Sequence, residues 1–128
     1  MNRIFPTFLF LVALAACTPR AAQGQSLIDS LISPNEQRRG EFGRAVAGIG
    51  GDVNADGVPD IIVGADQEDP FSQEAGRAHI FSGANGNVLR TLQSPNSEDN
   101  GLFGISVAAF GGDLNADGVA DVMVGAPG

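Results

Sequence analysis

The sequence contains no lysine, tryptophan or tyrosine, and only one cysteine and one histidine. Its positive charge comes from seven arginines, which face 15 acidic residues and leave a formal net charge of −8. A protein that binds nucleic acid needs clustered cations against the phosphates, so this balance argues against a nucleic-acid partner. A single cysteine also rules out a disulfide within the chain.

Hydrophobic runs long enough to span a membrane are missing as well. The apolar run Phe8–Ala16 has nine residues, and a helix of that length cannot cross about 30 Å of hydrocarbon. It follows a positively charged start, so it predicts a removable export signal over residues 1–16. The end of this signal, Leu14–Cys17, resembles the lipobox of bacterial lipoproteins, in which the cysteine becomes the lipid-modified first residue. We therefore expect lipidation of Cys17 and a lipid-anchored protein in the cell envelope.

An ordinary secretory cleavage after Ala13–Ala15 is the alternative, and it would give a secreted or periplasmic protein. Both readings predict export. Residues 17–26 are small and polar, and we expect them to form a flexible tether between the signal and the folded part.

An internal repeat organises the rest of the chain. Residues 42–66 and 103–127 align without a gap at a constant offset of 61, and 16 of the 25 aligned positions are identical. The same offset predicts a repeat region over residues 27–128, with a first unit at about 27–87 and an incomplete second unit at about 88–128.

Short apolar stretches bounded by glycine, asparagine or proline predict strands rather than helices in each unit. With 18 glycines and seven prolines, the chain has many residues suited to tight turns. Asn85-Gly86 suits the turn of a hairpin. The expected strands are residues 45–49, 61–65, 77–81 and 88–92, together with the last strand of a preceding blade at about 27–32. We therefore predict an all-β fold with about one and a half four-stranded antiparallel blades.

Two acidic loops share the pattern D-x-N-x-D-G-x-x-D, at residues 52–60 and 113–121. Oxygen ligands at alternate positions reach one cation when the chain curls tightly, and the glycine permits that turn. The donors suit Ca²⁺ better than Mg²⁺, which retains its waters, or Zn²⁺, which takes His and Cys. The candidate metal ligands, with Val58 and Val119 acting through their carbonyls, are Asp52, Asn54, Asp56, Val58, Asp60, Asp113, Asn115, Asp117, Val119 and Asp121. We expect one Ca²⁺ in each loop.

Two other interpretations of these loops are possible. Asp, Asn and Gly also form ordinary turns without a metal. An EF-hand needs a bidentate glutamate at its twelfth position, where this chain has Val63 and Val124, so the loops are not EF-hands.

Taken together, the motifs resemble the FG-GAP repeats of integrin α chains and of many bacterial surface proteins. The resemblance rests on Phe42-Gly43 and Phe103-Gly104, on the acidic loops, and on Gly125-Ala126-Pro127. It covers about residues 27–128, although Asp66 replaces the proline of the first Gly-Ala-Pro. The family implies a seven-bladed β-propeller, Ca²⁺ in strand-connecting loops, and adhesion or ligand display. On this resemblance the fold is a partial β-propeller.

No catalytic motif is visible in the sequence. His79 lies alone in a strand and is expected to be a packing or edge residue without an acid–base partner, and residues 66–74 are expected to form a solvated loop. We expect Phe42, Phe81, Phe103 and Phe110 to be core aromatics.

The prediction is a non-catalytic, Ca²⁺-binding surface segment that binds a protein or glycan ligand. Further blades or oligomerisation would close its fold. The alternatives are an accessory propeller of a larger secreted hydrolase, or a truncated remnant without function.

Overall fold

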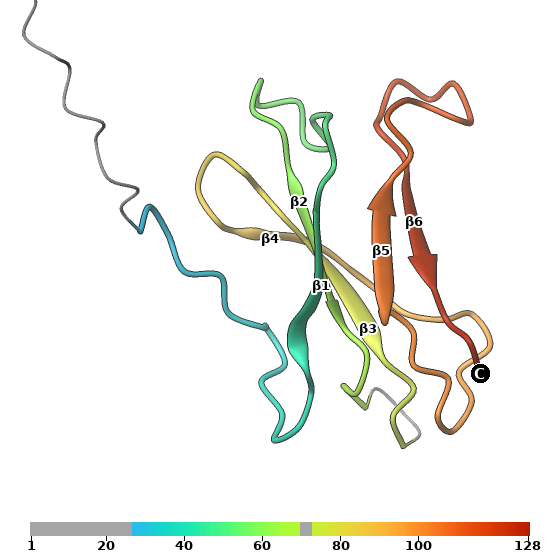
Figure 1. Ribbon diagram of the computed structural model, residues 1–128. Helices are drawn as coiled ribbons and strands as arrows, with labels where there is room; N and C mark the ends of the chain where they lie inside the picture. The colour runs from blue at the N-terminus through green and yellow to red at the C-terminus, as the bar shows by residue number, and fades with distance from the viewer. Residues whose placement is uncertain (1–26, 70–72) are drawn as a thin grey trace, which may run out of the picture.

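The computed structural model describes residues 27–69 and 73–128, so the predicted export signal, Cys17 and the predicted tether lie outside the described residues. Six strands form the fold (Figure 1): β1 Phe42–Gly48, β2 Ile61–Ala65, β3 Arg77–Phe81, β4 Val88–Leu92, β5 Ser106–Ala109 and β6 Val122–Gly125. In this described part of the chain, no helix has the length and apolar character needed to cross a membrane.

The first four strands form one antiparallel sheet in the order β1-β2-β3-β4, and β5 and β6 form a separate antiparallel pair. This confirms the all-β prediction, and the arrangement is consistent with partial propeller blades. The bounds of β2, β3 and β4 are those predicted. β1 begins earlier than expected, at Phe42, because a bulge between Phe42 and Ala45 lets the pairing with β2 continue past Gly43.

The prediction of a strand at residues 27–32 is wrong, since this segment has no regular structure. Its counterpart at the offset of 61 is β4, which is held by pairing with β3. No strand in the described residues pairs with residues 27–32, and an extended segment without a partner leaves its backbone groups unpaired. The sequence pattern was therefore that of a strand, but the pairing that makes one is absent here.

The repeat is reproduced in the backbone. Left-handed conformations recur at equivalent positions, with φ of 61° at Ala55 and 60° at Ala116, and of 86° at Gly57 and 87° at Gly118. Alanine adopts this conformation at a cost, so its recurrence indicates that the same loop is formed twice. The structure thus contains one complete four-stranded unit, β1 to β4, and the first two strands of a second, β5 and β6; these sets of strands are the first and second units of the fold.

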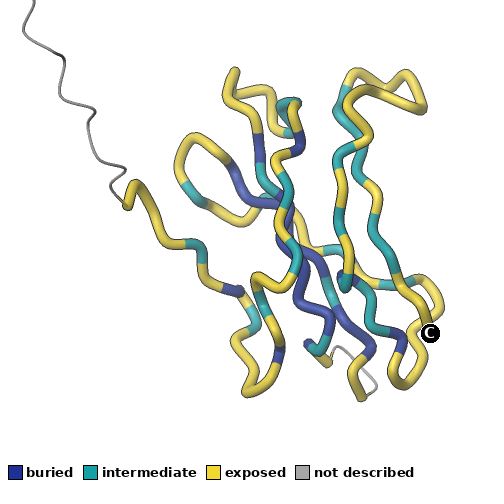
Figure 2. Tube along the Cα trace, in the orientation of Figure 1, coloured by how far each residue is buried: buried dark blue, intermediate teal, exposed yellow. Residues whose placement is uncertain are grey.

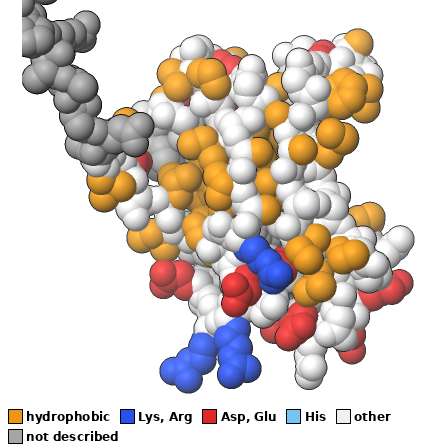
Figure 3. Space-filling model, viewed as in Figure 1, with side chains coloured by type: hydrophobic (Ala, Val, Ile, Leu, Met, Phe, Trp, Pro, Cys, Tyr) orange, Lys and Arg blue, Asp and Glu red, His pale blue; other side chains and the backbone are white. Residues whose placement is uncertain are grey.

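The core lies in the four-stranded sheet and at its junction with β5 and β6 (Figure 2). Ile49, Ile62, Ala78 and Ile80 form its fully or nearly fully buried centre. Phe81 is buried as predicted, but the expectation for Phe110 is wrong. Phe110 is 47% exposed, whereas Ile49 at the equivalent position is 0% exposed, because strands corresponding to β3 and β4 do not cover the second unit in the described chain. Hydrophobic side chains are accordingly exposed on the face shown in Figure 3.

Backbone pairing joins the two units. Leu102 N donates to Glu74 O at 3.0 Å and Phe103 N donates to Ala75 O at 2.9 Å, which places the start of the second unit along the loop before β3. β5 then packs against β1 and β2. This junction brings the two acidic loops to the same end of the molecule, at the top of Figure 1.

Candidate metal centre

The two acidic loops connect β1 to β2 and β5 to β6, and they lie next to each other. A cavity of about 460 Å³ is lined by residues of both loops, including Asp52 and Asp113. The loops meet closely: a Cβ added to Gly51 would lie 2.4 Å from the Cβ of Ala120. Two sets of carboxylates are therefore presented at one end of the protein.

The first loop is closed by hydrogen bonds from its own backbone to its acidic side chains. Asp52 accepts from Asn54 N at 3.1 Å and from Gly57 N at 2.5 Å, and Asp56 accepts from Val58 N at 2.8 Å. The side chain of Asn54 donates to Asp56 Oδ2 at 2.9 Å. Negative side chains thus fix the curl of the loop by pairing with its amides.

The second loop repeats most of this pattern, although Asp113 accepts from Asp117 N at 3.0 Å where Asp52 accepts from Asn54 N. Asp113 accepts from Gly118 N at 2.6 Å, and Asp117 accepts from Val119 N at 2.9 Å and from Asn115 Nδ2 at 2.9 Å. Because the same bonds form twice in different surroundings, the motif itself dictates the loop conformation.

The ninth position of each loop anchors the loop to the following strand. Asp60 is fully buried, and its two carboxylate oxygens accept from Val53 N at 2.7 Å and Gly83 N at 3.1 Å. Its counterpart Asp121 accepts from Leu114 N at 2.5 Å. Asp60 is therefore held further inside than the other candidate ligands, whereas Asp121 is half-buried.

Within residues 27–69 and 73–128, no three His, Cys, Asp or Glu side chains form a group that could hold a metal ion. The loops bring the aspartates and asparagines of the motif together through hydrogen bonds, and their carboxylates are directed to backbone donors. The donor chemistry nevertheless fits Ca²⁺, since every candidate is an oxygen ligand. A carboxylate also has about four acceptor positions, of which Asp52 uses two.

Two of the loop carboxyls have pKa values below their ordinary value of 3.8. For Asp56 the main cause is the hydrogen bond from the Asn54 side chain, and for Asp117 it is the hydrogen bond from Val119 N. Both side chains are therefore ionised at neutral pH. Since their pKa values are lower in the folded state, these carboxylates contribute stability above pH 3.8 that is lost as the pH falls through the folded-state pKa.

Replacing Asn54 with alanine is expected to raise the pKa of Asp56 toward 3.8, because its principal hydrogen-bond donor is removed. Carboxyl chemical shifts followed by NMR during an acid titration measure this change. The pKa of Asp117 in the other loop should stay where it is. An Asp56 pKa that does not move would contradict the assignment of Asn54 as its main donor.

A buried polar network that the sequence analysis missed lies at the opposite end of the sheet. Glu68 and His79 are both fully buried, with His79 Nε2 2.9 Å from Glu68 Oε2. His79 Nδ1 lies 3.0 Å from Thr91 Oγ1, and the hydroxyl of Ser33 donates to the other oxygen of Glu68. Arg77 lies 3.9 Å from Glu68. His79 therefore has an acid–base partner, and the prediction that it lacks one is wrong.

The prediction that residues 66–74 form a solvated loop is wrong at its start. Asp66 is fully buried and pairs with Arg44 at 3.0 Å, and Glu68 is buried in the network above. In the second unit the positions of Arg44 and Asp66 are taken by Ile105 and Pro127. Both partners of the ion pair thus change together, and this paired change was the available signal that Asp66 is not a solvated residue.

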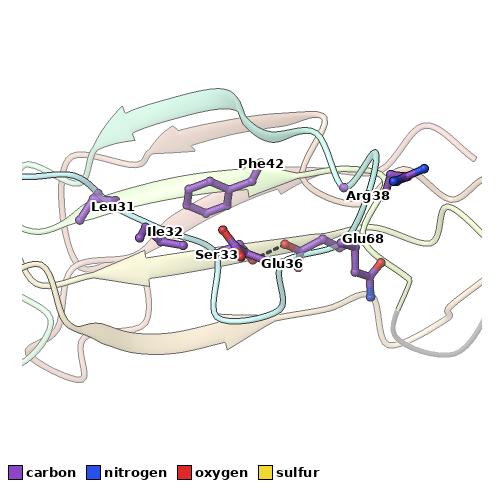
Figure 4. Close-up of a pocket in the computed structure, with 9 residues that line it drawn as sticks. Leu31, Ile32, Ser33, Glu36, Arg38, Phe42 and Glu68 are labelled. Atoms are coloured by element: carbon purple, nitrogen blue, oxygen red, sulfur yellow. Dashed lines mark hydrogen bonds between the residues drawn. The ribbon is translucent and has the colours of Figure 1, made fainter.

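Beside this network is a cavity of about 510 Å³ (Figure 4), lined by Ser33 and Glu68 and by the apolar residues Leu31 and Phe42. The hydrogen bonds run from Ser33 to Glu68 and from Glu68 to His79. The serine hydroxyl therefore donates to the glutamate and makes no hydrogen bond to the histidine. This is not the arrangement in which a histidine activates a serine nucleophile. The network instead fastens the segment before β1 to the sheet.

Comparison with known proteins agrees with this geometry. Residues 42–81 match the model of the FG-GAP repeat family. Human integrin alpha-7 is 36% identical over 114 residues, which are 84% of this chain and 9% of that protein. Bovine integrin alpha-2 is 37% identical over 103 residues, 75% of this chain and 8% of that protein. Mouse integrin alpha-8 is 34% identical over 129 residues, 89% of this chain and 12% of that protein.

The chain spans about a tenth of the length of the curated relatives that it matches. The match to the family model covers β1, the first acidic loop, β2 and β3, which are the elements that hold the first candidate site. The chain therefore carries an FG-GAP repeat that is similar to the repeats of integrin alpha chains.

Proposed function

We propose that each acidic loop binds one Ca²⁺ and that the chain serves binding rather than catalysis. The first ion would be held by Asp52, Asn54, Asp56, the carbonyl of Val58 and Asp60. The second would be held by the equivalent set Asp113, Asn115, Asp117, the carbonyl of Val119 and Asp121. The observation that carries the proposal is the repetition of one loop conformation, with most of its hydrogen bonds and with the same all-oxygen donor set, at both positions.

Calcium would neutralise the carboxylates of each loop and would hold the loop against its neighbouring strands. Each loop places three carboxylates within nine residues, and like charges at such separations repel one another. A divalent cation neutralises most of that charge and ties the loop to the strands on either side. Because the carboxylates are directed to backbone amides, we expect binding to rotate side chains within a backbone that is already formed.

The proposed role of the whole protein is adhesion or ligand display on the cell surface, with a protein or glycan as ligand. Similarity to integrin alpha chains supports this proposal. We also propose export through residues 1–16, lipid anchoring at Cys17 and a tether at residues 17–26, on the sequence pattern alone.

Further propeller blades, in the same protein or in another copy, are the proposed partners of the exposed apolar positions. Met123 in β6 is 51% exposed, whereas its counterpart Ile62 in β2 is 0% exposed and is paired with Ile80 of β3. At the other end of the repeat, Leu31 and Phe42 line the open cavity, whereas their counterparts Leu92 and Phe103 pack against the core. Neighbouring units of the same kind would cover both surfaces.

Calcium is expected to raise the thermal midpoint of unfolding, because a ligand that binds only the folded state stabilises it. At a free concentration 100 times the dissociation constant, one site adds about 2.7 kcal/mol to the free energy of unfolding. The measurement compares unfolding in Ca²⁺ with unfolding in a chelator. The double variant Asp56→Ala, Asp117→Ala should lose the difference, and equal midpoints for the unmodified protein in both buffers would count against the proposal.

A further inference from the structure

The two acidic loops share most of their internal hydrogen bonds, including every one within the motif that reaches the carboxylates at its fifth and ninth positions, but their surroundings differ. The first loop is contacted by the turn between β3 and β4, residues 82–87. The hydroxyl of Ser82 donates to Asp56 Oδ2 at 3.1 Å, and Gly83 N donates to Asp60 Oδ1 at 3.1 Å. Ser82 is almost completely buried, whereas Asp56 is exposed, so the hydroxyl reaches the loop from the protein side. Two of the proposed ligands are thus held from outside the motif.

The turn that supplies these contacts is itself fixed. Ser82 N donates to Asn87 O at 2.8 Å, Gly86 N donates to Ser82 O at 2.9 Å, and Asn87 N donates to Asn85 Oδ1 at 2.9 Å. The turn also lies directly on the loop, since a Cβ added to Gly83 would be 1.9 Å from the carbonyl oxygen of Pro59. The turn is therefore a rigid support, and glycine permits its close approach.

We infer that the β3–β4 turn is an outer part of the first metal centre, in which Ser82 is a positioning residue that orients the carboxylate of Asp56. The inference rests on the proposed Ca²⁺ function. Groups that hydrogen-bond to a metal ligand set its orientation, and their loss typically lowers metal affinity about 10- to 100-fold. Ser82 lies one residue beyond the stretch that matches the repeat family.

The second loop serves as an internal reference. The corresponding oxygen, Asp117 Oδ2, accepts a hydrogen bond from Asn115 Nδ2, and in the described part of the chain no hydroxyl donates to it. A change at Ser82 should therefore act on the first site and leave the second as it is.

The test is calorimetric titration of the full chain with Ca²⁺, one site at a time. The variant Asp117→Ala leaves only the first site, and Asp56→Ala leaves only the second. Adding Ser82→Ala to the Asp117→Ala protein is expected to weaken Ca²⁺ binding at the first site about tenfold. Adding Ser82→Ala to the Asp56→Ala protein should leave the Ca²⁺ affinity of the second site unchanged. Ser82→Thr, which keeps the hydroxyl, should restore binding at the first site.

Asn85→Ala is the matched control, because it removes a side-chain hydrogen bond from the same turn without touching the loop. It should leave both affinities unchanged. The inference is overturned if Ser82→Ala has no effect on the first site, or if Asn85→Ala weakens that site equally. Failure of the proposed function itself would look different, since the unmodified protein would then bind no Ca²⁺ at either loop.

Discussion

Replacement of Glu68 by alanine is expected to lower the free energy of unfolding by about 3–5 kcal/mol, the range seen when one partner of a buried ion pair is removed. Glu68 is fully buried, and its carboxylate joins the segment before β1, through Ser33, to β3, through Arg77 and His79. Alanine would remove the hydrogen-bond partner of Ser33 and His79 and the ion-pair partner of Arg77. Such a loss is a large part of the 5–15 kcal/mol that stabilises a typical domain.

Urea denaturation measures this loss, with Glu36→Ala as the matched control. Glu36 lines the same cavity but is exposed, so its replacement should change the free energy of unfolding by less than about 0.5 kcal/mol. If Glu68→Ala cost no more than Glu36→Ala, the network would not be the fastening described here.

Gly104→Ala is expected to destabilise the protein by about 3 kcal/mol. Gly104 has φ of +95°, a conformation that costs a residue with a Cβ about 1–2 kcal/mol. A Cβ at this position would also lie 2.1 Å from the carbonyl oxygen of Arg77 in β3, and overpacking typically adds 1–3 kcal/mol. The second unit would have to move away from the first to make room.

The repeat supplies the control for this variant. Gly43 is the counterpart of Gly104, with φ of +90°, but a Cβ there would meet nothing within 4 Å. Gly43→Ala should therefore show the conformational cost alone, about 1–2 kcal/mol. Equal losses for the two variants, measured by urea denaturation, would show that the close approach between the units does not limit stability.

What the sequence predicted well is what local patterns determine. The strands of the first unit follow from apolar stretches between turn residues. The loop at Asp52 recurs at Asp113 because the nine residues of the motif supply most of the hydrogen bonds that close it. The prediction that residues 27–32 form a strand was wrong because a strand also depends on a partner, which a local pattern does not contain.

The buried acidic residues could not be found from the local pattern. Asp66 and Glu68 lie in a segment rich in charge, which is typical of a solvated loop. They are buried because they meet residues distant in sequence, Arg44 in one case and Ser33 in the other. Comparison of the two units at the offset of 61 would have marked Asp66, since its partner changes with it, but Glu68 has no counterpart within the chain.

Equilibrium dialysis against Ca²⁺ tests the central claim most directly, because it counts the ions bound per chain without reference to stability. The unmodified protein is predicted to bind two ions, Asp56→Ala and Asp117→Ala one each, and the double variant none. Retention of no Ca²⁺ by the unmodified protein, at concentrations up to the millimolar range of extracellular sites, would contradict the account and leave the loops as turns closed by their own hydrogen bonds.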